Sequence, residues 1–399
     1  MISLFAFLAS LTACESNDLP IQHADSYRYI TFAAQTQKMM TRADDRYESY
    51  DPDQRMHPLN MGVFGYYNFA THNFEATEKG DENHTIFANT QVDHTIFANT
   101  LVEYDQSTKT WSTQKEKKWD DYQGSNFDFF GYMPYSESAT LSKPSATEST
   151  YLLTIPFSMP KINGSTPSPI LAQKDLRQAP IICAKPEHKG STTAEGSDAT
   201  FERVVTFLFD QTLTGYNLNF QLDQKMNAIR YFRIKGVKIY GTGLATEGNV
   251  SRSYTWKNNE WSAKSIQWNN LNTVDITEEN GIRLAKDENS ETPFAPADSE
   301  SMDIKDNQYH HWGTTFYAIA DTSFVPTIAV TYDVILKDEK GEPVTRENVT
   351  STISLGNKYF ETLYPTHTAA IYNINILIQP RYLYVLADQD AYTGHLLIQ

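Results

Sequence analysis

Alternation of apolar and polar side chains is the feature of this sequence that most constrains its fold. From Tyr216 to Leu222 every second residue is apolar, and the residues between them are Asn or Gln. The segments 328–336 and 372–378 repeat the pattern with many β-branched residues. A period of two places alternate side chains on opposite faces of a β-strand. These segments therefore predict strands that each bury one face.

Other segments of the chain also predict strands and turns. Residues 254–261 read as a hairpin around Asn258 and Asn259, because paired Asn residues tolerate positive φ. Residues 230–241 read as a strand with a bulge at Gly236. Long stretches of helical periodicity are hard to find. The predicted fold class is all-β, and many short strands favour sandwiches over a parallel α/β sheet.

Composition excludes some classes of function. The 399 residues are 40% hydrophobic and 21% charged, which is typical of a globular chain with a sizeable core. The formal net charge is -16. A nucleic-acid-binding protein needs a concentrated basic surface, and no stretch of this sequence supplies one. We therefore expect no nucleic-acid partner.

The N-terminal segment predicts export and lipidation. Residues 1–13 form an apolar run that is too short to span a bilayer and is typical of a signal peptide. Small residues at Thr12 and Ala13 precede Cys14, and the pattern resembles the lipobox of bacterial lipoproteins. Acyl chains on Cys14 would tether the protein to a membrane. Residues 14–28 are then a lipidated linker, and their acidic start resembles the export signal of Bacteroidetes surface lipoproteins.

A change in composition suggests where domains meet. Residues 186–200 contain no large apolar side chain and are rich in Gly, Ser and Thr. We interpret them as a linker between an N-terminal β-sandwich domain, 29–187, and a C-terminal one, 201–399. The alternative is a long hairpin loop within one domain. Cys183 lies in an apolar run just before this segment, and we expect a buried structural thiol.

The sequence contains one tandem repeat. Residues 83–92, NHTIFANTQV, are followed directly by residues 93–102, DHTIFANTLV. The repeat period of ten is even, so either copy presents the same side chains to the same face of a strand. Two copies are too few for a solenoid, and a duplication that lengthened an edge hairpin explains them.

Known catalytic motifs are absent from the sequence, and we predict no catalytic residue, metal or cofactor. The adjacent His310 and His311 would point to opposite faces of a strand and could not share an ion there. Trp256, Trp261 and Trp268 could form a platform for stacking sugars, but packing in the core or at an edge is the favoured interpretation.

Several segments together resemble a known family. They are strand-like, rich in aromatic residues and arranged in a fixed order behind the lipobox. They are Tyr29–Ala33, Thr41–Ala43, Gly62–Tyr67, Phe127–Tyr135, Lys174–Pro180, Val204–Asp210, Ile234–Gly241 and Ile371–Gln379. In this order the chain resembles the fimbrillin family of the Bacteroidetes, the FimA-like and Mfa-like pilus subunits. The chain departs from the family pattern at Asp210 and before Tyr372, which suggests a divergent, tip or accessory subunit.

The resemblance implies two tandem transthyretin-like β-sandwiches and an assembly mechanism. A lipidated precursor is cut by an Arg-specific protease after the first strand, at Arg42 or its neighbour Arg46. Loss of the first strand, near 29–32, opens a groove that a strand from the next subunit fills. Residues 382–399 are the expected donor, or else they close their own C-terminal sheet. The implied location is the outer membrane and the fimbrium, with other subunits and a host protein or glycan as partners.

Two further functions compete with the fimbrial one. The first is a surface glycan-binding lipoprotein that uses the tryptophan platform. The second is a glycoside hydrolase whose acids the sequence does not reveal, since 49 carboxylates make chance pairs in space certain. We expect a structural or adhesive subunit and not an enzyme.

Overall fold

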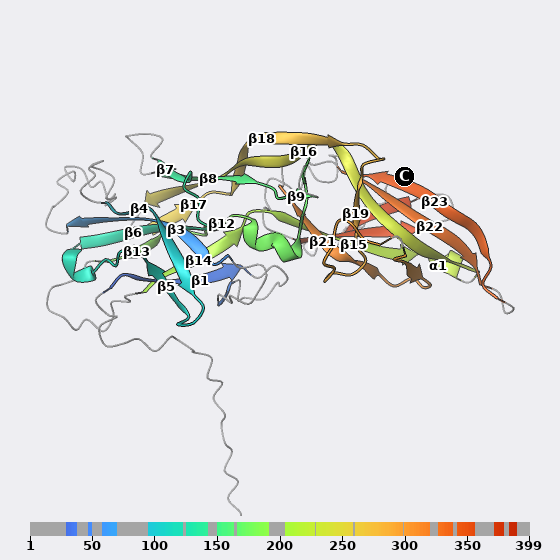
Figure 1. The fold of residues 1–399 in the computed structure, drawn as a ribbon, viewed down its shortest axis with the longest axis horizontal. Coiled ribbons are helices and arrows are strands. Elements are labelled where there is room, and N and C mark those ends of the chain that lie inside the picture. The colour runs from blue at the N-terminus through green and yellow to red at the C-terminus, as the bar shows by residue number, and fades with distance from the viewer. Residues whose placement is uncertain are drawn as a thin grey trace, which may run out of the picture.

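The computed structural model describes residues 29–37, 47–49, 58–69, 95–122, 125–142, 150–162, 166–190, 204–227, 229–257, 260–297, 299–319, 326–337, 341–355, 371–378 and 383–388. The molecule is elongated, with a β-barrel at one end and a two-layered β-sandwich at the other (Figure 1). Only short helical turns interrupt the strands in these ranges. The prediction of a mostly β fold is therefore confirmed.

Seven strands close into a ring at the N-terminal end. They pair in the order β12-β14-β1-β5-β4-β3-β6, and β6 pairs back with β12. Their bounds are β1 (Thr31–Gln37), β3 (Asn60–Phe69), β4 (Thr95–Asp105), β5 (Thr110–Thr113), β6 (Ser125–Met133), β12 (Ile181–Cys183) and β14 (Val204–Gln211). Two short strands extend the ring, β2 (Tyr47–Ser49) on β1 and β13 (Glu187–Lys189) on β6. Closure removes the free edges that an open sheet would leave.

Strand β6 is buried on both of its faces. Phe129 points into the barrel, where its ring lies near that of Phe32. Phe130, on the opposite face, packs against Tyr254 and Trp261 of a second sheet that covers the outside of the barrel. This double burial explains why β6 has aromatic side chains on both faces, where a strand with one wet face would alternate apolar and polar residues.

One long strand joins the two ends of the molecule. Strand β16 (Arg230–Lys257) has 28 residues. Its first half pairs with β22 (Thr327–Leu336), β19 (Ile282–Leu284) and β20 (Met302–Ile304) in the sandwich. Its second half pairs with β8 (Thr150–Ser158), β17 (Glu260–Ala263) and β18 (Gln267–Ile276) beside the barrel. β23 (Val344–Ser354) and β7 (Thr140–Ser142) are the outer strands of this sheet.

The second layer of the sandwich is a five-stranded sheet. It consists of β11 (Leu171–Ala172), β21 (His310–Ala318), β15 (Thr214–Leu222), β24 (Ile371–Ile378) and β25 (Leu383–Asp388), in that order. The alternating apolar residues of 216–222 and 372–378 are buried and face the apolar side of β16 and β22. The periodicity of these segments therefore predicted both the strands and the face that they bury.

The bulge predicted at Gly236 is confirmed, and it explains the burial pattern along β16. The register with β22 shifts between Ile234 and Gly236. Ile234, before the shift, and Val237, after it, are both fully buried, although they are three positions apart and a regular strand would place them on opposite faces. The extra residue restores the inward orientation of the apolar residues that follow.

The remaining elements are short connections. They are the hairpin of β9 (Lys161–Ile162) and β10 (Thr166–Pro167), the 3-10 turns η4 (Trp119–Tyr122) and η5 (Gln173–Gln178), and the single α-helical turn α1 (Gln224–Asn227). No helix in the described part of the chain is long and apolar enough to cross a membrane.

Strand pairing crosses the boundary that composition suggested. β12 and β14 pair antiparallel, so the segment interpreted as a linker connects two neighbouring barrel strands, as in the hairpin alternative. Part of that segment forms β13, which pairs with β6. The domain ranges 29–187 and 201–399 stay a prediction, and residues 1–28 lie outside the described residues.

Candidate functional site

Strand β1 occupies a seam in the barrel between two unequal neighbours. Six consecutive residues of β1 pair with β14 in parallel, from Thr31 opposite Val204 to Thr36 opposite Phe209. Among the described residues, one ladder pair with β5 joins Phe32 to Trp111. On the same edge as β5, residues 35–37 of β1 pair with β2, so β14 is the one long partner and two short strands share the opposite edge.

The start of β1 has further contacts on the β5 side. Tyr29 forms an isolated bridge with Lys118, and the Ile30 amide donates to the Lys117 carbonyl over 2.8 Å. The Lys118 ammonium lies 5.5 Å from the centre of the Tyr29 ring, which is within the range of a cation–π contact. The strand is therefore paired on both edges at its start, and again at Gln35 and Thr36, where β2 lies on the edge opposite β14.

Alternate side chains of β1 fill the barrel interior. Ile30, Phe32 and Ala34 are only 5–6% exposed, whereas Thr31 and Ala33 are half-buried on the outer face. The seam therefore accommodates two large side chains followed by a small one, at every second position of the strand. The alternation also explains why a strand forms here, because a single set of apolar side chains points to the core.

Phe32 lies at the centre of the aromatic core of the barrel. Its ring stacks on Phe207 of β14 at 6.3 Å and meets Phe97 of β4 edge-on at 5.5 Å. The Phe129 ring of β6 lies 6.4 Å away, also edge-on. Loss of β1 would expose these three rings together with the unpaired backbone edge of β14. The site is therefore suited to binding a β-strand.

The predicted site residues are not all within the described part of the chain. Cys14, the predicted lipidation site, lies outside it, and so do the predicted cleavage sites Arg42 and Arg46. In the sequence, both arginines fall between β1 and β2. These two strands pair with each other at residues 35–37 and 47–49. The first strand itself begins at Thr31 and extends to Gln37, further than the predicted 29–32.

The proposed donor segment 382–399 is described only in part. Residues 383–388 form β25, which pairs antiparallel with β24 at the end of the five-stranded sheet. In the single chain this segment thus closes its own sheet, which is the alternative that the sequence left open. Residues 389–399 lie outside the described part of the chain.

The tryptophans suggested as a sugar platform are packed instead. Trp256 and Trp261 are each 4% exposed and lie in the core beside the barrel. The Trp261 indole donates to Asp128 over 2.8 Å, and the half-buried Trp268 donates to the Thr212 carbonyl over 3.1 Å. The packing interpretation is confirmed. A glycan platform on this hairpin is wrong, because the ring faces are not accessible.

A buried polar cluster joins the barrel to β16. Arg252 forms an ion pair with Asp210 over 2.7 Å, and both side chains are 12% exposed. The Tyr254 hydroxyl donates to the Cys183 carbonyl over 2.7 Å, and the thiol of Cys183 lies 3.2 Å from that hydroxyl. Burial raises the pKa of the Cys183 thiol. Cys183 is therefore the buried structural thiol that the sequence predicted, and a low-pKa nucleophile is not supported.

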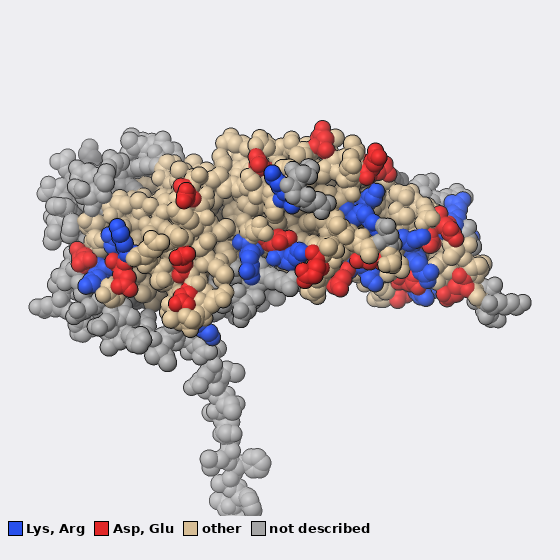
Figure 2. All heavy atoms as spheres, viewed as in Figure 1, with Lys and Arg blue, Asp and Glu red and all other residues tan. Residues whose placement is uncertain are grey.

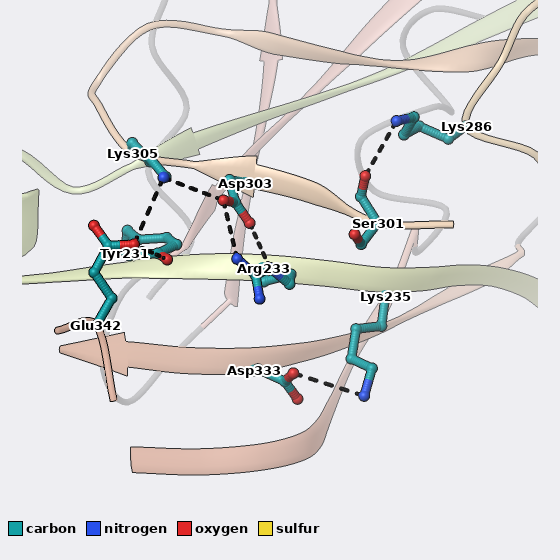
Figure 3. A network of polar contacts seen from close by, with 9 residues as sticks. All are labelled: Tyr231, Arg233, Lys235, Lys286, Ser301, Asp303, Lys305, Asp333 and Glu342. Atoms are coloured by element: carbon teal, nitrogen blue, oxygen red, sulfur yellow. Dashed lines mark hydrogen bonds and ion pairs between the residues drawn. The ribbon is translucent and has the colours of Figure 1, made fainter. Parts of the chain in front are cut away.

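A second polar network lies on the sandwich (Figure 3). Arg233 of β16 donates to both carboxylate oxygens of Asp303 on β20, over 2.7 and 3.2 Å. Lys305 lies 4.5 Å above the Tyr231 ring, whose hydroxyl donates to Glu342 over 2.7 Å. Arg233 thus faces a carboxylate and Lys305 faces a ring, and these contacts join neighbouring strands to one another.

Histidines and acids do not gather into a metal site in the described part of the chain. His310 lies 2.7 Å from Asp306, whereas His311 lies 3.1 Å from Asn219. The two rings have separate partners, as expected for neighbours on a strand. On the face shown in Figure 2, basic and acidic side chains are interspersed and form no basic patch.

Comparison with known proteins gives matches in structure only. No family model matches the chain, and no curated protein matches its sequence. A fimbrial protein from Bacteroides vulgatus aligns with 90% of this chain and 98% of its own, at 14% identity and a TM-score of 0.42. A fimbrial assembly protein from Parabacteroides distasonis aligns with 93% of this chain and 99% of its own, at 9% identity and a TM-score of 0.34.

The ordered motifs of the sequence resemble the same class of protein. Both proteins are described as fimbrial and neither as an enzyme.

Sequence reasoning missed how β1 is held. The segments 29–33 and 204–210 were both recognised as strand-like, but nothing in either pattern indicates that they pair in parallel. Both segments are rich in aromatic and β-branched residues, which indicates strands but does not identify their partners.

Proposed function

We propose that this protein is a fimbrial subunit or accessory adhesin, exported as an outer-membrane lipoprotein and assembled by exchange of β1. The observation that carries the proposal is the position of β1 in the barrel. The strand fills an aromatic seam between β14 on one edge and the short strands β5 and β2 on the other. It is followed in the sequence by two arginines at which a protease could release it. Within the proposal, the barrel and sandwich parts correspond to the two transthyretin-like domains that the resemblance implies.

The energetics favour refilling of the seam once β1 has left. A buried backbone group without a partner costs about 1–3 kcal/mol, and the edge of β14 would present several. Exposing one buried Phe side chain costs about 1.5–3 kcal/mol, and three rings line the seam. A strand from the next subunit reverses both losses. The cut subunit is thereby driven to polymerise.

The incoming strand has to place large, large and small apolar residues at every second position, as Ile30, Phe32 and Ala34 do. Residues 383, 385 and 387 of β25 are Leu, Val and Ala, which repeats that order. In the described part of the chain, β25 lies at a sheet edge, where it pairs with β24. These features support the C-terminal segment as the donor, released from its own sheet and inserted into the neighbouring barrel.

Cleavage also separates the subunit from its anchor in this proposal. Cys14 precedes β1, so a cut at Arg42 or Arg46 leaves the lipid on the released peptide. The chain would be tethered to the outer membrane before cleavage and would lie in the fimbrium afterwards. Its partners are other subunits and, if it is a tip adhesin, a host protein or glycan. A Cys14→Ala variant is expected to leave the membrane fraction.

The test is controlled cleavage of the purified precursor. An Arg-specific protease is added, and the products are separated on a denaturing gel without boiling. We expect loss of an N-terminal fragment followed by a ladder of polymers. Arg42→Ala and Arg46→Ala, singly and together, identify the cut site, and the double variant should remain monomeric. Efficient cleavage at this site without any polymer would contradict the proposal.

A further inference from the structure

The tandem repeat meets the barrel at β4. The second copy, residues 93–102, supplies the first eight residues of this strand, from Thr95 onward. The first copy, residues 83–92, precedes it in the sequence. Eight residues are identical between the copies: His84 to Thr90 match His94 to Thr100, and Val92 matches Val102.

The identical residues are those that the barrel requires of β4. Ile96 and Phe97 are 6% and 1% exposed, and the Phe97 ring lies near that of Phe32. Val102 is fully buried, and Val92 takes the same place in the first copy. The period of ten is even, so Ile86 and Phe87 would point to the same faces after a shift by one repeat.

A special backbone site in β4 is also satisfied by both copies. The register with β3 shifts between Val63 and Gly65, and Asn99 has a φ of 48°. Few side chains other than Asn tolerate this conformation. The Asn99 amide donates to the Ser136 carbonyl over 2.9 Å and accepts from the Tyr132 hydroxyl over 2.6 Å. Asn89 supplies the same side chain at the same place in the first copy.

We propose that β4 has two interchangeable registers, in which either the second copy or the first occupies the strand. The shift moves a ten-residue stretch from the connection before β4 to the connection after it. One connection leads into β4 from β3 and the other leads out of it to β5, so they lie at opposite ends of the strand. The exchange thus transfers a loop from one end of the barrel to the other. The shift shortens one connection and lengthens the other. Because the entropy cost of closing a loop depends only weakly on its length, this change opposes the shift little.

The residues that differ between the copies explain why the second occupies the strand. After the shift Gln91 would replace the half-buried Leu101, and His94 would replace Tyr104, whose ring packs on Trp111 at 5.1 Å. The tight turn to β5, in which Asp105 accepts from the Ser107 amide over 2.8 Å, would open. The shifted register is therefore the minor one in the unmodified chain.

Three variants of the full chain test the exchange by thermal unfolding. Phe97→Asp places a charge in the aromatic core, which the chain can avoid by inserting Phe87 in its place. Phe87→Asp should leave the unfolding midpoint unchanged, and Phe97→Asp should lower it by less than half as much as the double variant. Equal losses in Phe97→Asp and in the double variant would overturn the proposal.

Disulfide trapping gives a readout that does not depend on the stability of Phe97→Asp. The Tyr104 amide donates to the Leu59 carbonyl, so the neighbouring pair Asn60 and Glu103 is not hydrogen-bonded and approaches closely. In the shifted register Asp93 stands opposite Asn60. We expect an Asn60→Cys/Asp93→Cys disulfide to form in redox buffer, identified by peptide mass, and to be lost when Phe87→Asp is added.

The matched control is Asn60→Cys/Glu103→Cys, which reports the register of the structure and should form whether or not Phe87 is replaced. If the disulfide between positions 60 and 93 fails to form while the control disulfide forms, β4 has a single register and the proposal is wrong.

Discussion

Replacing Phe32 by Ala removes the side chain that anchors β1, and its effect can be estimated from the structure. Phe32 is 5% exposed, and its ring contacts three others on β4, β6 and β14. Truncation of a buried Phe to Ala costs about 3–5 kcal/mol. We expect a loss of that size in the unfolding free energy of the uncut precursor, unless detachment of β1 alone is less costly. If β1 detaches on its own, the loss in unfolding free energy cannot exceed the free energy by which β1 stabilises the precursor.

The assay is urea unfolding followed by tryptophan fluorescence, with Thr31→Ala as the matched control. Thr31 lies on the same strand but is half-buried on its outer face, so its truncation should cost less than about 1 kcal/mol, as most substitutions away from the core do. After cleavage and removal of β1, the Phe32→Ala and unmodified proteins become the same molecule and should unfold identically. A loss in Phe32→Ala no larger than that in Thr31→Ala would refute the argument that this ring holds β1 in its seam.

Three further predictions concern the polar contacts. Arg252→Met removes the ion pair to the buried carboxylate of Asp210 and should cost about 3–5 kcal/mol in urea unfolding. Trp261→Phe removes a hydrogen bond to the buried Asp128 and should cost about 1.5–3 kcal/mol, without changing retention on a polysaccharide gel. For Asp303, burial acts to raise the pKa, but hydrogen bonds from Arg233 and Lys305 outweigh it and lower the pKa. Its contribution to stability should be complete above about pH 4 and disappear as the pH falls through the lowered pKa, measured as the difference from Asp303→Asn.

Each of these predictions has an outcome that contradicts it. Lys235→Met is the control for Arg252, because Lys235 lies 3.6 Å from Asp333 and is 37% exposed; equal losses in the two variants would mean that burial of the first pair is unimportant. Weaker polysaccharide binding in Trp261→Phe would restore a glycan role for this hairpin. A difference between the unmodified protein and Asp303→Asn that grows on acidification would have the wrong sign.

Local features of this fold were readable in the sequence, because they depend on neighbouring residues. The alternation at 216–222 and 372–378 gave the strands and their buried faces, and Gly236 gave the bulge. Cys183 was correctly expected to be buried, because it lies in an apolar run.

Features that depend on distant segments were not readable. Strand β16 was expected to end near Gly241, but it continues to Lys257 because β8 and β18 pair with its second half. Closure of the barrel depends on β12, a strand of three residues that pairs with both β14 and β6. No periodicity can be recognised in a segment that short. The N-terminal strands therefore form a closed ring where an open sandwich was expected.

The candidate site was predicted in part for the same reason. The sequence indicated a first strand followed by arginines, and the structure adds that Phe32 is surrounded by Phe97, Phe129 and Phe207. Those three phenylalanines come from three separate strands, so only the fold brings them together. The tryptophan pair 256 and 261 was readable as neighbours across a hairpin, but its burial depends on the barrel strand β6 that covers it.

The most direct test of the account is to lock β1 in place during cleavage. Ala33 pairs with Thr206 of β14, and both are half-buried on the outer face, so cysteines at these positions are close enough for a disulfide. With Ala33→Cys/Thr206→Cys oxidised, an Arg-specific protease should cut the precursor without producing polymers, and reduction should then release β1 and start polymerisation. A ladder that forms equally well while β1 stays disulfide-bonded to the barrel would contradict strand exchange at this seam.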